Sequence, residues 1–116
     1  MSTRKILNGK IENTTLLIER GSLTCYLFID HEEGNQAFGG WSFGSRRIYD
    51  PKDEVGNFGS WFITRLLTTF KVNAWEDLIN TPIRISIENE KIISVGNYYK
   101  DEWFEPAAEI ENLKKG

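Results

Sequence analysis

The sequence predicts an α+β domain in which a mainly antiparallel sheet of about five strands packs one face on a single main helix. Three observations support this fold class. Residues 22–30 and 83–88 alternate in the period of two that half-buried strands show. Residues 61–71 carry an apolar stripe at helical spacing. The resulting element order, β-β-β-α-β-β, favours antiparallel pairing with the helix on one face.

The chain has the length of one domain, so residues 1–116 are treated as a single unit. We expect the ordered core to span about 11–106. Residues 1–9 and 107–116 are expected to be flexible ends.

The first two strands are expected at 11–19 and 22–30, joined by a tight turn at Arg20-Gly21. In the second strand one face is wholly aliphatic and should be the core side, with Cys25 as a small buried apolar residue. The other face carries Tyr26 and Phe28, which another element or a partner should cover. The core-side residues are Leu23, Cys25, Leu27 and Ile29.

A third, glycine-broken strand is expected at 36–43, followed by a long loop over 44–59. Loops of that length are more often functional or mobile than short connections are. Ser60 can cap the helix at 61–71, and a short helical turn should follow at 74–80. The last two strands are expected at 82–88 and 91–99, before an aromatic anchor at Trp103-Phe104 and a short polar helix or frayed end. The helix stripe consists of Phe62, Ile63, Leu66, Leu67 and Phe70.

Composition excludes several classes of partner and setting. A net charge of −3 and a pI near 5.2 leave no basic excess for duplex nucleic acid and suit a basic protein surface instead. A single cysteine cannot form an internal disulfide, which disfavours an oxidising compartment. The N-terminus has no signal-peptide apolar run, and no stretch is long enough to span a membrane. We therefore expect a cytoplasmic protein with no membrane partner.

Catalytic and metal chemistry have little support in the sequence. His31 is the only imidazole, and it lies in an acidic turn whose consecutive side chains diverge, so a solvated loop is a better interpretation than a metal site. Without a second base, nucleophilic catalysis would depend on that one residue. We expect no enzyme activity, no catalytic residues, no cofactor and no metal.

The main candidate binding site is the segment from Trp41 to Arg47 with the adjoining 44–59 loop. The glycine-rich stretch from Gly34 to Gly44 leads into it, and its glycines fit either a bulge or sharp bend in a strand or a close approach of the backbone to a ligand. Trp41 and Phe43 followed by Arg46 and Arg47 combine stacking rings with guanidinium groups, as a nucleotide pocket requires.

On the helix, Trp61 projects nearly opposite the apolar stripe and on the same flank as Arg65. The two side chains could form a cation–π pair or an anchor for a partner, or the preceding loop could cover Trp61. The sequence favours neither an exposed Trp61 of this kind nor a Trp61 that the loop covers.

Several motifs together resemble small phage and prophage proteins of unassigned function. The resemblance spans about residues 11–106, and it is most specific in the glycine stretch and at the C-terminal end. Proteins of this kind often carry His after the glycine of the last strand, where this chain has Asn97. The motifs are Gly34-x-Gln36-x-Phe38-Gly39-Gly40-Trp41, Trp75-Glu76-Asp77-Leu78, Pro82-Ile83-Arg84-Ile85, Val95-Gly96 and Lys100-Asp101-x-Trp103-Phe104-x-Pro106.

The resemblance implies an accessory protein of a phage or mobile element. Our leading hypothesis is a non-catalytic inhibitor of a bacterial defence system that binds either a protein effector, such as a CRISPR component, or its nucleotide second messenger. The alternative is a phage regulatory or assembly protein, and an enzyme comes third. Because the second strand is apolar on both faces, we also expect a homo-oligomer, in particular a dimer.

Overall fold

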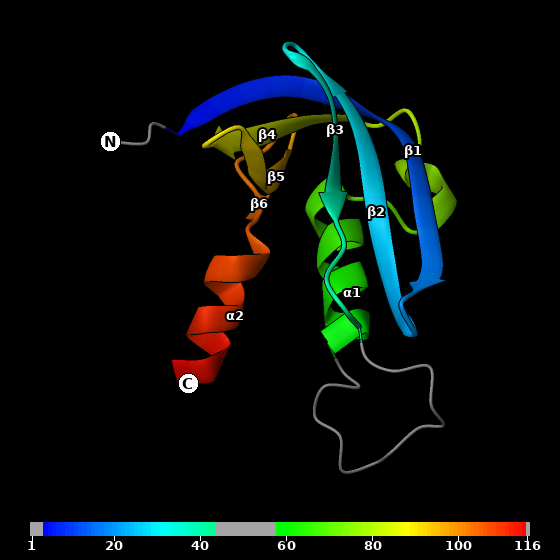
Figure 1. Cartoon of the computed structure of the whole chain (residues 1–116). Helices are drawn as coiled ribbons and strands as arrows, with labels where there is room; N and C mark the ends of the chain where they lie inside the picture. Colours follow the sequence, from blue (N-terminus) through cyan, green and yellow to red (C-terminus); the bar gives the residue numbers. More distant parts are fainter. Residues whose placement is uncertain (1–3, 44–57, 116) are drawn as a thin grey trace.

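The computed structural model describes residues 4–43 and 58–115 and confirms the α+β class (Figure 1). Six strands form one antiparallel sheet in the order β3-β2-β1-β4-β5-β6. The sixth strand is the two-residue Trp103–Phe104 anchor, which the sequence did not indicate as a strand. The elements are β1 (Lys5–Glu19), β2 (Ser22–His31), β3 (Gly34–Gly39), α1 (Phe58–Phe70), the 3-10 turn η2 (Trp75–Leu78), β4 (Pro82–Glu88), β5 (Lys91–Asn97), β6 (Trp103–Phe104) and α2 (Pro106–Lys115).

Strand β1 is long, and it changes partners halfway along. Its first part pairs with β4 from Lys5 to Lys10, and its second part pairs only with β2, as far as Glu19. The register with β2 shifts between Ile11 and Asn13, which marks a β-bulge. The strand therefore starts at Lys5 rather than at Ile11, because β4, a partner distant in sequence, holds the segment that we expected to be a flexible end.

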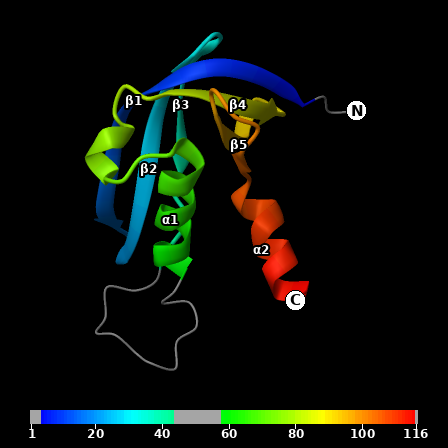
Figure 2. The same ribbon diagram turned by 180° about the vertical axis from the view of Figure 1, so that it is seen from behind.

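Helix α1 covers the concave face of the curved sheet, as Figures 1 and 2 show from opposite sides. Phe62 and Leu66 are fully buried there, in one core cluster with the aliphatic side chains of β2 and β4. The helix begins at Phe58, so Ser60 is an exposed residue within it and not its cap. Gly59 lets this first turn pack directly on the core, because a side chain at this position would meet Phe43 at 2.9 Å.

The predicted faces of the strands are largely confirmed. Cys25, Leu27 and Ile29 are buried, as are Ile83, Ile85 and Ile87 of β4. The buried face of β2 does not include Leu23 at the start of the strand, which is 37% exposed. On the other face, Phe28 is 39% exposed, so no element of the described chain covers it fully. Two strands are shorter than predicted: β3 ends at Gly39 and β5 at Asn97.

Helix α2 starts at Pro106 and extends on the same side of the sheet as α1 (Figure 2). Residues 107–115, for which the sequence indicated either a short polar helix or a frayed end, are helical as far as Lys115. None of the helices among residues 4–43 and 58–115 has the length and apolar character needed to cross a membrane.

Candidate functional site

The aromatic half of the predicted nucleotide site belongs to the protein core. Phe43 is 6% exposed and contacts Phe58 and Phe62, with ring centroids 5.8 and 5.2 Å apart. Trp41 is half-buried and packs on Phe62 at 5.4 Å. Stacking on a base needs an accessible ring face, which Phe43 does not offer. Arg46 and Arg47 lie outside the described residues.

The glycine stretch forms a bend, which was one of its two predicted roles. Gly39 and Gly40 both have positive φ, at 130° and 88°. A side chain at Gly39 would come within 2.2 Å of the Cys25 carbonyl oxygen, to which the Gly40 N–H donates at 2.9 Å. The close approach that requires glycine is therefore to the neighbouring strand.

Trp61 and Arg65 lie together on one flank of α1, as predicted, but they join α1 to the C-terminal elements. Trp61 is half-buried between Phe58 and Phe104. Arg65 donates to Glu109 of α2 at 2.8 Å and to the Trp103 carbonyl at 2.9 Å, and its guanidinium lies over the ring of Phe104. The cation–π partner of Arg65 is thus Phe104, and this contact is structural.

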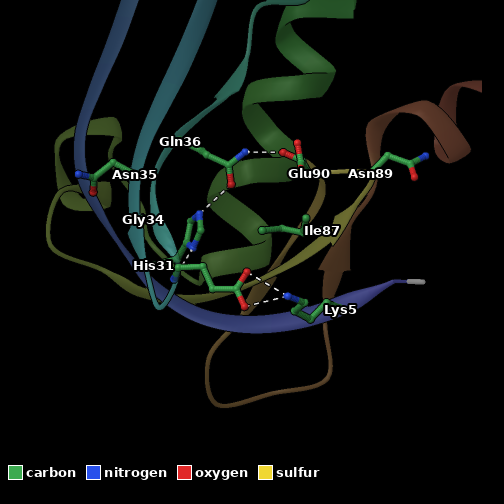
Figure 3. A pocket seen from close by; sticks show the side chains of 9 residues that line it. Lys5, His31, Gly34, Asn35, Gln36, Ile87, Asn89 and Glu90 are labelled. Atoms are coloured by element: carbon green, nitrogen blue, oxygen red, sulfur yellow. Dashed lines mark hydrogen bonds and ion pairs between the residues drawn. The ribbon is translucent and has the colours of Figure 1, made fainter. Parts of the chain in front are cut away.

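A polar cavity of about 430 Å³ lies where the β2–β3 turn meets the β4–β5 turn (Figure 3). Gln36 bridges the two turns: its amide N–H donates to the Glu90 carbonyl at 2.8 Å, while its oxygen faces His31 Nε2 at 2.7 Å. The Glu33 N–H donates to His31 Nδ1 at 3.1 Å, so the arrangement corresponds to the neutral Nε2–H tautomer.

The hydrogen bonds around this cavity join the two turns, so its role is structural. Lys5 and Glu33 both line the cavity and form an ion pair at 2.8 Å. The Lys5 ammonium group, which could otherwise bind an anion, is therefore paired with Glu33. His31, predicted in a solvated loop, is half-buried and hydrogen-bonded. No group of three or more His, Cys, Asp or Glu side chains in the described part of the chain is placed to hold a metal ion.

Among the described residues, the most accessible aromatic feature is the turn after β5. Tyr98 and Tyr99 are 42% and 80% exposed, and their rings meet edge to face at 5.1 Å. Asn97 holds this turn from within: its side-chain oxygen accepts the N–H groups of Tyr99 and Lys100 at 2.8 and 3.0 Å. Its amide nitrogen donates to the Thr69 carbonyl of α1 at 2.9 Å, so the turn is fixed to the helix.

Arg84 fixes the same turn from β4. It donates to the carbonyl groups of Asn97 at 2.9 Å and Lys100 at 2.8 Å. Its guanidinium also lies 4.8 Å from the ring centroid of Trp103, whose ring is in turn packed on Gly96. Arg84, Gly96 and Trp103, which belong to three of the sequence motifs, therefore meet at the base of this turn.

Sequence reasoning missed this turn because it extended β5 to Tyr99. One signal was present: adjacent residues of a strand point to opposite faces, so two neighbouring tyrosines cannot both be core. The position held by Asn97 has a structural role here, since both ends of its amide are occupied within the fold.

Two side chains of residues 4–43 and 58–115 have clear pKa shifts, and neither shift makes a reactive group. Burial raises the pKa of the Cys25 thiol to about 12, which keeps it protonated and inert. The hydrogen bond that Tyr26 donates to Glu19 at 2.5 Å raises the pKa of the Tyr26 phenol above its usual value.

Comparisons of the chain with protein-family models, with curated proteins and with solved structures gave no match.

Proposed function

We propose that this chain is a non-catalytic binding protein that docks on another protein through the tyrosine turn. This turn consists of residues 97–100, with Tyr98 and Tyr99 at its surface. The observation that carries the proposal is an 80% exposed Tyr99 on a turn held by Asn97 and Arg84. Tyrosine contributes large contact area with few rotatable bonds, and it is enriched at binding hot spots. A turn that is already ordered loses little entropy on binding.

A protein partner fits the geometry better than a nucleotide does. Nucleotide binding required Trp41 and Phe43 as stacking rings, and these pack against Phe62 in the core. Two cationic side chains of the described residues, Lys5 and Arg65, form ion pairs with Glu33 and Glu109 and so are not free to hold a phosphate. The tyrosine turn, by contrast, presents two aromatic rings at the surface, and the chain's net negative charge favours a basic partner surface.

The resemblance to phage and prophage proteins gives the setting of the proposal. The partner is a protein effector of a bacterial defence system, and the chain inhibits it in the cytoplasm of the host. A phage regulatory or assembly function would use the same surface on a different protein. We also expect the chain to form a homodimer and to bind neither duplex nucleic acid nor membranes.

Phage challenge of hosts carrying individual defence systems tests this function directly. The wild-type chain should rescue phage from at least one system, and the double variant Tyr98→Ala, Tyr99→Ala should lose that rescue while keeping its unfolding midpoint. The matched control is Tyr26→Ala with Phe28→Ala, because these residues form a second pair of neighbouring aromatic rings that are at least partly exposed, with ring centroids 6.2 Å apart. The control pair should keep the rescue.

Three results would count against the proposal. Rescue from none of the systems removes the anti-defence function. Full rescue by the tyrosine double variant moves the site away from the turn. Loss of rescue in Arg46→Glu with Arg47→Glu, together with binding of a nucleotide messenger by the wild-type chain in calorimetry, favours the nucleotide alternative instead.

A further inference from the structure

In the described part of the chain, the second half of β1 has a strand neighbour on one side only. Its pairing with β4 ends at Lys10, and the Ile11 backbone makes the last contacts on that side, with Thr81 and Asn80. From Glu12 to the turn at Arg20, the described sheet places only β2 beside β1. Figure 1 shows this part of β1 at the outer side of the β1–β2 hairpin. Such an edge is a template for another strand.

The backbone groups that point to this edge can be identified from β2. The carbonyl oxygens of Leu23 and Cys25 accept from Phe43 and Gly40, on the β3 side of β2. The alternate residues Thr24, Tyr26 and Phe28 must therefore bond β1, where their register partners are Leu17, Thr15 and Asn13.

It follows that Thr14, Leu16 and Ile18 direct their N–H and C=O groups to the open edge. The Thr14 N–H donates to the side chain of its neighbour Asn13 at 2.9 Å, as expected for a donor with no strand beside it. Their side chains lie on the concave face, where Leu16 is 49% and Ile18 45% exposed, next to Leu23. An unpaired ladder and an apolar stripe thus coincide.

The edge is chemically complementary to itself. Antiparallel strands pair residues of the same backbone orientation, so two copies of this edge can be centred only on a single residue. The full segment 12–20 overlaps when Leu16 lies opposite Leu16 of the second copy. Thr14 then faces Ile18, and Glu12 faces Arg20, so no like charges are opposed. Shifting the centre by one residue either way leaves one end without a partner.

We propose that two copies of this chain pair antiparallel through residues 12–20 of β1, around a two-fold axis at Leu16. The pairing satisfies the open backbone groups and joins the apolar stripes of the two copies on one face. It closes the edge as well, because an isologous contact uses the same surface on both copies. The proposal is independent of the tyrosine turn.

The oligomeric state of the full chain is the first test. Light scattering from low to several hundred micromolar concentration should approach twice the 13.4 kDa chain mass. Leu16→Pro removes the central edge donor without removing a bond to β2, so it should give a folded monomer at every concentration. Amide exchange of Leu16 and Ile18 should slow as the wild-type concentration rises.

A charge swap tests the register. Glu12→Arg and Arg20→Glu, each alone, oppose like charges at both ends and should raise the dimer dissociation constant about tenfold. The combined variant restores opposite charges and should return the constant to within about twofold of the wild type. Glu111→Arg, an exposed change on α2, is the control and should leave it unchanged.

The proposal fails if the wild-type chain is a monomer throughout, if Leu16→Pro stays dimeric, or if the charge swap does not restore association. Growth beyond the dimer would also overturn it, because the two-fold pairing closes. If the chain is a monomer alone but Leu16→Pro loses binding to a foreign protein, the edge pairs with that protein and not with a second copy.

Discussion

Gly96→Ala tests whether the packing around Trp103 holds the tyrosine turn. An alanine Cβ at position 96 would lie 2.6 Å from two ring atoms of Trp103, so the ring must move or the strands must separate. A displaced ring loses its contact with Arg84 and its hydrogen bond to Asp101 at 3.1 Å. Those two losses amount to about 1–2 kcal/mol. Keeping the ring in place by overpacking costs about the same, roughly 1–3 kcal/mol.

Alanine also restricts the unfolded chain, which returns about 0.4–1 kcal/mol. We therefore expect a net loss of about 1 kcal/mol in the free energy of unfolding, measured by urea denaturation. Because the same contacts support the turn, partner binding through Tyr99 should weaken in this variant too.

The Trp103→Ala background isolates the cause. Without the indole ring the clash is absent, so Gly96→Ala should become stabilising, by about 0.4–1 kcal/mol. The change of sign in this double-mutant cycle is the decisive observation. An equal loss of stability in both backgrounds would refute the reasoning, because the cost would then lie in the backbone of β5 and not in the ring.

Three further predictions concern the core, the thiol and the second helix. Leu66→Ala empties a fully buried position of α1 and should cost about 2–5 kcal/mol in urea denaturation; a cost below about 0.5 kcal/mol would contradict its burial. Cys25 should resist thiol reagents in the folded protein. Its folded pKa of about 12 lies above the ordinary value of 9.0, so its contribution to stability is complete below pH 9 and is lost as pH rises toward 12; the alkaline loss should be smaller in Cys25→Ala. Glu109→Ala removes the partner of Arg65 and the acceptor of the Glu105 N–H, and amide exchange in α2 should quicken while α1 is unchanged; equal protection in the variant would show that other contacts hold α2.

The fold was predictable where one side-chain period dominated a segment. The alternation at Ile83, Ile85 and Ile87 and the Phe62–Leu66 spacing each reflect burial on one face, which sequence records directly. The extent of β1 was not predictable in the same way. Its residues 5–10 mix polar and apolar side chains, and they are held as a strand by β4, a partner whose position no local pattern indicates.

The candidate site was harder to predict than the fold, for a different reason. Aromatic residues and arginines near a long loop are equally compatible with a binding pocket and with contacts that hold the fold together. Phe43 is a core residue, and Arg65 connects α1 to α2. Which ring faces solvent depends on neighbours such as Gly96 and Asn97 that act through tertiary contacts. Exposure of Tyr99 is therefore a property of the assembled turn.

The change of partner along β1 also has a kinetic consequence. Hairpins β1–β2 and β4–β5 close short loops and can form early, whereas joining Lys5–Lys10 to β4 closes most of the chain and carries a larger entropic barrier. The Gln36–Glu90 hydrogen bond connects the β2–β3 hairpin to the turn of the β4–β5 hairpin, so it can form only after these two hairpins have docked. Weakening it should leave the folding rate nearly unchanged and speed unfolding. This hydrogen bond would then determine the unfolding rate, and so the lifetime of the native state, and not the folding rate.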